Sequence, residues 1–335
     1  MFSAQLSFQN HHSVKSAPQS TVDVAQRESS RLFLNFRKKF YRFRESCIKR
    51  YLELTNKNYA YAFSYYPDIK TAPNANGSYE VFFKKRKILT SCSYDELPKN
   101  IDEVYILGSG PSVTHQNIAA LKNKNVIFLN GSITVATQHG IKPFAHIIID
   151  KNFIINRSDL LLSFARTTSE PTPLFLSLPA LEAALVFCRE IIFKYKIFII
   201  CIKEQELMHS QLSPWQLPGK YFAISGDKQT AFSMDLNEGF WDGGTVMGHA
   251  VQLCHYLGVR NTYMLGFDIG NAAQPRFYEN SKNKQKSSLL RDYETKILPF
   301  MTFAAQIFKE SSQNIYNCSP VSKLPYEIIA YSKFQ

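Results

Sequence analysis

The sequence predicts an α/β protein: a Rossmann-like, doubly wound and mostly parallel sheet, preceded by a basic helical N-terminal extension. Short apolar runs recur from about residue 101 onward, and each is followed by Gly, Ser, Asn or Asp and then by a helical pattern. Strands buried on both faces that alternate with helices are typical of a parallel sheet covered on both sides. The concentration of basic residues before residue 100 predicts the extension.

The composition is that of a folded protein with one large domain and an appendage, or two ordinary domains. The chain has 335 residues, of which 45% are hydrophobic and 20% charged, with 14 Gly and 15 Pro. These values exclude collagen-like and globally disordered chains. The six cysteines form no CxxC pair, so we expect reduced thiols rather than a disulfide framework or a zinc site.

Neither a membrane span nor a secretory signal is expected. The longest apolar run, residues 191–202, is interrupted by Lys194 and Lys196 and is shorter than the roughly 20 residues that a span needs. The first residues lack a basic segment followed by an apolar stretch. We therefore expect a cytoplasmic protein.

Basic residues are concentrated in the N-terminal third. Residues 1–100 contain 17 Lys and Arg against 8 Asp and Glu, in a chain with a net charge of +12. Residues 1–30 are polar and lack periodicity, which predicts a flexible tail. Residues 31–100 are predicted to form a basic amphipathic helix and a connector. The apolar residues of this helix recur at steps of three and four: Leu32, Phe36, Phe40, Phe43, Cys47 and Tyr51.

Three interpretations of this basic helix stay open. It can lie on an anionic membrane surface, where each nearby Lys or Arg contributes about 1 kcal/mol. It can bind nucleic acid, although no sequence motif of a nucleic-acid-binding domain is found and no such partner is expected. It can also pack on the main domain with a solvated basic face. A second basic cluster, residues 84–87, follows the strand-like residues 79–83.

Residues 101–335 are predicted to form the Rossmann-like domain. The predicted strands cover residues 103–107, 125–129, 144–149, 174–176, 196–202 and 261–265. In such sheets ligands bind beyond the carboxyl ends of the strands. Four polar residues end separate strand or loop units at this edge and are predicted to line a ligand site: Asn130, Asp150, Thr245 and Asp268.

The loop after the first predicted strand has the composition of a phosphate-binding turn. It consists of Gly108, Ser109, Gly110, Pro111 and Ser112. Glycines let the backbone approach a ligand, proline starts a helical turn, and Ser112 can present a hydroxyl beside free amides. The loop is not a Walker A motif, since no GK[ST] follows, and Val113 stands where the third Gly of GxGxxG would be. A tight turn without any ligand would use the same residue types.

A series of motifs follows along residues 103–330: GSGPS, NVIFLNGS, KPFAHIIID, a GGT turn, YMLGFD, RFYEN, SSLLRDYETKILPF and NIYNCSP. In this order they resemble the bacterial lipopolysaccharide-core enzymes known as Kdo-III transferases (WaaZ type), and residues 266–320 are the most specific part. More distantly, the Gly-x-Gly-Pro-Ser loop, the Asn ending the second strand and the Gly-x-Asp are similar to bacterial CMP-sialic acid sialyltransferases. The resemblance implies a glycosyltransferase whose donor sugar is activated as its CMP ester.

The resemblance also implies roles for individual residues. The loop 108–112 and Asn130 would hold the CMP phosphate and ribose. Tyr278 would donate a hydrogen bond to the leaving phosphate, and Arg276 would add a positive charge there, because fixed donors aimed at developing charge lower the barrier. The residues that would frame the cytidine are Gly244, Thr245, Gly266 and Asp268.

The proton acceptor departs from the pattern of the sialyltransferases, which place a histidine base downstream of the tyrosine. The matching stretch SSLLRDYETK contains no histidine, so we predict Asp292 as the base and Asp150 as the second candidate. A solvated surface pair of Arg291 and Asp292 is the alternative. His249 and His255 are six positions apart on one predicted helix, about 240° around it, and cannot face one ligand together.

We therefore expect an inverting glycosyltransferase that moves Kdo from CMP-Kdo to the lipopolysaccharide inner core. Its expected partners are the CMP-activated sugar, the lipid A-core acceptor and the anionic inner-membrane surface, where the protein would be peripheral on the cytoplasmic face. No HExxH or DxD-like motif is present, so neither a metal nor another cofactor is expected. The alternatives are a CMP-sialic acid sialyltransferase of the same fold, a pterin pyrophosphokinase-like protein, and a non-catalytic protein that binds nucleotide sugars or membrane surfaces.

Overall fold

The computed structural model describes residues 21–55, 68–203, 217–271 and 273–334. The chain divides into two compact units, residues 1–57 and residues 58–335. The first contains helix α1, and the second contains every described strand. Within the described residues, no helix combines the length and the apolar character that crossing a membrane requires.

Helix α1 (Thr21–Leu54) contains the predicted amphipathic segment. It starts earlier than expected: residues 21–30, assigned above to a flexible tail, are helical, and residues 1–20 of that tail lie outside the described residues. Ala, Gln, Arg and Glu in this stretch favour helix even without an apolar period. The apolar positions predicted for one face are solvent-exposed, with Phe36 and Phe43 each 67% exposed.

The predicted connector contains a small antiparallel sheet of three strands: β1 (Ile69–Pro73), β2 (Tyr79–Phe83) and β3 (Arg86–Thr90). Strand β2 confirms the strand expected at residues 79–83. Lys84 and Lys85 of the basic cluster form the hairpin turn between β2 and β3, with φ values of +50° and +65°, and the other two residues of the cluster begin β3. Two residues with positive φ are typical of a tight hairpin turn whose twist matches its strands.

The main sheet has seven strands, and all of its neighbouring pairs are parallel, as predicted. Its spatial order is β12-β11-β4-β5-β6-β7-β8. The strands are β4 (Glu103–Leu107), β5 (Val126–Leu129), β6 (Pro143–Ile148), β7 (Thr172–Ser177), β8 (Tyr195–Ile200), β11 (Asn261–Leu265) and β12 (Asn314–Asn317). Strand β12 was not predicted, because its four residues, NIYN, carry little apolar signal. A separate hairpin pairs β9 (Phe222–Ile224) with β10 (Ala231–Ser233).

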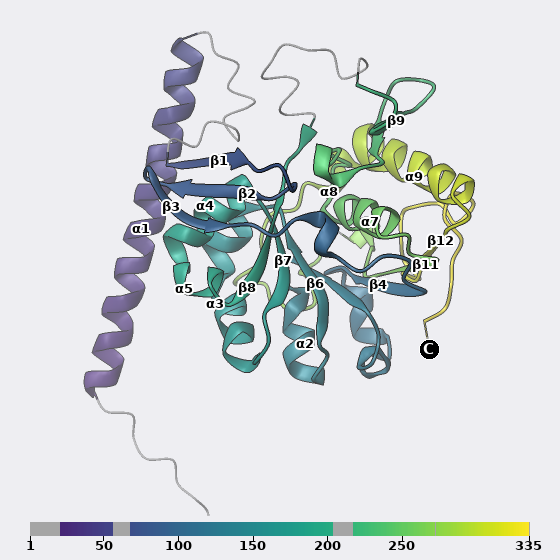
Figure 1. Cartoon of the computed structure of the whole chain (residues 1–335). Coiled ribbons are helices and arrows are strands. Elements are labelled where there is room, and N and C mark those ends of the chain that lie inside the picture. Colours follow the sequence, from purple (N-terminus) through teal and green to yellow (C-terminus); the bar gives the residue numbers. More distant parts are fainter. Residues whose placement is uncertain (1–20, 56–67, 204–216, 272, 335) are drawn as a thin grey trace, which may run out of the picture. The chain divides into compact units, whose positions relative to one another are not determined.

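Both faces of the main sheet are covered, as the buried strand runs predicted. Ile106 and Ile127 of the sheet belong to one apolar cluster with Met247 and Phe300, which lie on α7 (Val246–Tyr256) and α9 (Leu298–Glu310). The opposite face carries helices α2 (Ile133–His139), α3 (Lys151–Thr167), α4 (Leu178–Phe187) and α5 (Arg189–Ile192) (Figure 1). The fold is therefore a doubly wound α/β sheet.

The strand order reverses between β4 and β11. From β4 the chain adds β5 to β8 on one side, and it later returns to place β11 and β12 on the other side. The loops after these two strands touch: the Gly108 N–H donates to the Leu265 carbonyl (2.8 Å), and the Gly110 N–H to the Gly266 carbonyl (2.9 Å). Such a reversal leaves a crevice at the carboxyl ends of the strands, which is where open α/β sheets bind their ligands.

Candidate functional site

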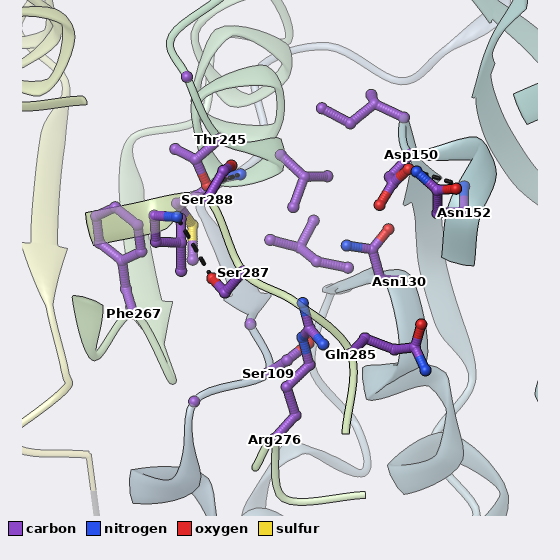
Figure 2. Close-up of a pocket in the computed structure, with 18 of the residues that line it drawn as sticks. Ser109, Asn130, Asp150, Asn152, Thr245, Phe267, Arg276, Gln285, Ser287 and Ser288 are labelled. Atoms are coloured by element: carbon purple, nitrogen blue, oxygen red, sulfur yellow. Dashed lines mark hydrogen bonds between the residues drawn. The ribbon is translucent and has the colours of Figure 1, made fainter. Parts of the chain in front are cut away.

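A pocket of about 750 Å³ lies at this edge, a volume typical of small-molecule sites. Figure 2 shows Asn130 and Asp150 on one side of it and Thr245 and Phe267 on the other. Most of the residues predicted for the site line this pocket: Gly108, Ser109, Gly110, Pro111, Asn130, Asp150, Gly244, Thr245, Gly266, Asp268 and Arg276. Three predicted residues, Ser112, Tyr278 and Asp292, are not part of its lining.

Ser112 does not offer its groups to a ligand. Its N–H donates to the Asp268 carboxylate (2.7 Å), and its hydroxyl donates to the same carboxylate. The hydroxyl of Ser319 donates there as well. The N–H and the hydroxyl of Ser112 are therefore hydrogen-bonded within the protein and are not free for a ligand. Through these bonds Asp268 joins the loop after β4 to the loop after β11. Ser112 and the carboxylate of Asp268 act as a clasp between two loops.

The close approach of these two loops also explains the two glycines of the loop after β4. A Cβ added at Gly110 would overlap the carboxyl group of Asp268, and one at Gly108 would lie 2.7 Å from the Gly266 carbonyl oxygen. Both glycines are therefore required by the close approach of the two loops. The hydroxyl-bearing residue that remains on the pocket side of the loop is Ser109.

Asn130 follows β5 and has a φ of +51°, in the left-handed region. Its side-chain oxygen is buried and has no hydrogen-bond partner among the described residues. A buried amide oxygen without a partner is costly, and this one lies on a residue that lines the pocket. Asn130 therefore has an unused hydrogen-bonding group at the site.

Tyr278 lies behind the pocket wall. A Cβ added at Gly131 would overlap the Tyr278 ring, so the ring packs directly on the turn that follows β5. Burial raises the pKa of Tyr278, while Arg276 and a hydrogen bond with Ser109 oppose this increase. Tyr278 is therefore protonated near neutral pH and is hydrogen-bonded to Ser109, which lines the pocket.

Arg276 lines the pocket as predicted. Its guanidinium donates to Glu279 Oε1 (2.8 Å), and its backbone N–H donates to Glu279 Oε2 (3.1 Å). The side chain of Glu279 is 1% exposed. Because both oxygens of a buried carboxylate hold Arg276, its guanidinium is fixed beside Ser109, as Figure 2 shows.

The first candidate base, Asp292, lies outside the lining of the pocket. Asp292, on the short helix α8 (Leu289–Asp292), forms two hydrogen bonds with the Arg291 guanidinium, at 2.8 and 3.0 Å. This pairing lowers the pKa of Asp292, and only Arg291 of the pair lines the pocket. The surface-pair alternative thus describes Asp292 better. Asp150, the second candidate, does line the pocket and caps α3 by accepting from the Asn152 N–H (2.8 Å).

Sequence reasoning missed Asp242, which also lines the pocket. Burial alone would raise its pKa, but Lys296, whose ammonium lies 3.0 Å from the carboxylate, and His249 lower it below the usual value. Asp242 accepts from the Gly244 N–H (3.0 Å), and Gly244 has a φ of +71°. Thr245 then caps α7 by accepting from the Met247 N–H (3.3 Å). The sequence signal that could have identified Asp242 as a pocket residue is its position directly before the GGT turn.

The segment before α8 forms a further wall that the sequence did not predict. It contributes Gln285, Lys286, Ser287 and Ser288 to the lining. Gln285 Oε1 accepts from the Asn156 side chain of α3 (2.7 Å), so the segment reaches across to the helix that follows β6. Among the described residues, four cationic side chains line the pocket beside three carboxylates: Lys151, Arg276, Lys286 and Arg291, with Asp150, Asp242 and Asp268. No group of three or more metal-ligating side chains suited to an ion is found in the part of the chain that the structure describes.

Two curated proteins are similar in sequence to 70% of this chain. A protein of Escherichia coli (strain K12) named probable 3-deoxy-manno-octulosonic acid transferase is 27% identical over 250 residues, covering 70% of this chain and 83% of its own. A protein of the same name from Salmonella typhimurium (strain LT2) is 26% identical over 242 residues, covering 70% and 87%. Among solved structures, the sialyltransferase CstII from Campylobacter jejuni with cytidine-5'-monophosphate is 12% identical, covers 70% of this chain and 86% of its own, and has a TM-score of 0.36.

The family model of the 3-deoxy-D-manno-octulosonic acid transferase WaaZ matches residues 94–199 and 222–335. These ranges include the main sheet except the last residue of β8, together with the loops after its other six strands. They exclude α1 and the three-stranded sheet β1–β3. The chain belongs to the WaaZ family of 3-deoxy-D-manno-octulosonic acid (Kdo) transferases, as its motifs predicted.

Proposed function

We propose that this glycosyltransferase takes Kdo from CMP-Kdo, transfers it to the inner core of lipopolysaccharide, and inverts the configuration at the anomeric carbon. The observation that carries the proposal is the pocket at the reversal of strand order. It gathers Ser109, Asn130, Asp150, Thr245 and Arg276 from five separate segments of the chain. These polar side chains surround a space large enough for a nucleotide sugar.

The charge of the pocket supports an anionic donor. CMP-Kdo carries a phosphate ester and a sugar carboxylate. Among the described residues that line the site, the four cationic side chains outnumber the three carboxylates, Asp150, Asp242 and Asp268. Arg276 is held in place by Glu279, and a fixed guanidinium binds phosphate or carboxylate oxygens strongly. A single phosphate requires less neutralisation than a diphosphate, so protein cations and hydroxyl groups suffice for the departing CMP.

The reaction needs one proton acceptor. A hydroxyl of the acceptor sugar attacks the anomeric carbon from the side opposite CMP, and the bond between that carbon and the phosphate oxygen breaks. The electron pair leaves with CMP, and the hydroxyl proton passes to a carboxylate. We assign this role to Asp150, because it lines the pocket while Asp292 is outside it and paired with Arg291.

The proposal is tested by incubating the purified protein with CMP-Kdo and a truncated lipopolysaccharide acceptor. We expect the acceptor to gain the mass of one Kdo, with release of one CMP per transfer. CMP-sialic acid serves as the competing donor and should give no product. Absence of CMP release with every core acceptor would overturn the proposed donor and acceptor.

We also propose that α1 binds the anionic surface of the membrane that holds the acceptor. Several of its large apolar side chains are exposed, among them Phe36 at 67%, Phe40 at 62% and Phe43 at 67%. Basic residues alternate with them in the sequence NFRKKFYRFR. Exposed aromatic side chains flanked by Lys and Arg match the interface of an anionic bilayer, where apolar burial and charge attraction add together.

Replacing Phe36, Phe40 and Phe43 by Ser is expected to lower vesicle binding at least about tenfold, since a buried Phe contributes about 1.5–3 kcal/mol. Sedimentation with vesicles that contain phosphatidylglycerol measures the bound fraction. The control is Asn35→Ser with Ser46→Ala, which changes exposed polar residues of the same helix and should leave binding unchanged. Equal sedimentation of both variants would contradict the proposed membrane contact.

A further inference from the structure

A buried histidine supports the turn that carries Asn130. His146 lies in the middle of β6 and is 0% exposed. Its Nε2 is 2.7 Å from the main-chain oxygen of Asn130. A carbonyl oxygen can only accept, so Nε2 carries the hydrogen and donates it. Burial lowers the pKa of His146 to about 4, which keeps the ring neutral near neutral pH, and the hydrogen bond to Asn130 places the proton of the neutral ring on Nε2.

The turn needs such support because Asn130 has a φ of +51°. Left-handed backbone at a residue other than glycine persists where the surroundings hold it. Ser132 provides one attachment: its hydroxyl accepts from the Leu129 N–H (2.8 Å) and donates to the Leu107 carbonyl on β4 (2.8 Å). His146 provides the other, on β6. The turn after β5 is therefore fastened to both neighbouring strands.

The orientation of this turn decides what faces the pocket. The Asn130 side chain extends into it, as Figure 2 shows, and its amide oxygen has no partner among the described residues. The next residue, Gly131, lies directly against the Tyr278 ring. A change in the backbone angles of Asn130 would therefore redirect its side chain and also press Gly131 against the Tyr278 ring.

We infer that His146 is a positioning residue for the donor nucleotide: its Nε2–H holds the main chain of Asn130 so that the Asn130 amide points at the bound CMP moiety. This inference rests on the proposed function for its ligand. His146 itself touches no substrate, since it lies inside the sheet and does not line the pocket. Its effect on binding passes entirely through Asn130.

The inference predicts a pattern of CMP affinities measured by isothermal titration calorimetry. His146→Leu should raise the Kd for CMP about tenfold, a change of about 1.4 kcal/mol in binding free energy. His146→Gln, whose side-chain NH₂ can donate to the same carbonyl, should restore most of the affinity. Thr262→Val changes another fully buried polar side chain of the sheet, away from the pocket, and should leave the Kd unchanged.

A double-mutant cycle separates positioning from general loosening. In an Asn130→Ala background, adding His146→Leu should weaken CMP binding no further, because the group that His146 orients is already gone. Additive losses, or equal losses for His146→Leu and Thr262→Val, would overturn the inference.

Crystal structures give a readout that does not depend on CMP. Relative to the unaltered protein, His146→Leu should show changed φ and ψ angles at Asn130 and a redirected amide, and His146→Gln should not. An unchanged Asn130 in His146→Leu would refute the positioning role. If the unaltered protein binds no CMP, the proposed donor fails, and the conformation of Asn130 still decides the role of His146.

Discussion

Asp150→Asn is expected to lower the kcat of Kdo transfer by about 100-fold or more, the contribution typical of a general base. The Kd for CMP should stay within about threefold, because an amide keeps the shape of the side chain and its acceptor oxygen. Asparagine caps helices as well as aspartate does, so the start of α3 and the melting temperature should be preserved. Steady-state kinetics with CMP-Kdo, calorimetry with CMP and thermal unfolding measure the three quantities.

Asp292→Asn is the matched control for this experiment. Asp292 is the same residue type, but it is paired with Arg291 and lies outside the pocket. Its replacement should change kcat by less than about threefold, since a carboxylate that contacts no reacting atom takes no proton from the acceptor. The opposite pattern, a large loss for Asp292→Asn and none for Asp150→Asn, would return the base to Asp292.

The general position of the site could be predicted because it follows from topology. Asn130, Asp150 and Thr245 were found by asking which polar residues end separate strand units, and parallel strands bring such ends to one edge. The prediction needed only the order of apolar runs along the chain. It did not need to know which strands are neighbours, and the reversal between β4 and β11 appears only in the structure.

The roles of single residues were less predictable, because they depend on contacts between distant positions. Ser112 and Asp268 are 156 positions apart in the sequence, and their polar groups are hydrogen-bonded to each other. No local pattern distinguishes such a pair from two residues that both face a ligand. The position of Asp292 has a local cause: its neighbour Arg291 donates to both of its carboxylate oxygens.

Irregular segments escaped the sequence analysis for a different reason. Asp242 and residues 285–288 lie between regular elements, where apolar periodicity gives no register. Their place on the pocket is set by tertiary bonds, such as the one between Gln285 and Asn156. Apolar periodicity predicts helices and strands, and therefore the positions at which they end. A connecting segment that lines a pocket has no such periodicity.

Asp268→Ala is expected to lower the free energy of unfolding by about 3–4 kcal/mol, because it leaves several buried donors without partners at about 1–3 kcal/mol each. Asp268 is 3% exposed. Its carboxylate accepts from the Ser112 N–H and from the hydroxyls of Ser112 and Ser319. Urea unfolding measures the change. CMP affinity should fall in parallel, since these bonds hold the loop that presents Ser109 to the pocket.

Asp268→Asn separates the hydrogen bonds from the negative charge. Its amide oxygen can accept from the Ser112 N–H, and its NH₂ can donate to the two serine hydroxyls, which also accept. We therefore expect Asp268→Asn to lose no more than about a third of the stability that Asp268→Ala loses. Asp102→Ala removes an exposed carboxylate paired with Arg260 and should change stability by about 0–1 kcal/mol. If Asp268→Ala were as stable as Asp102→Ala, the clasp would not hold the loops, and the carboxylate would be left to act on the donor directly.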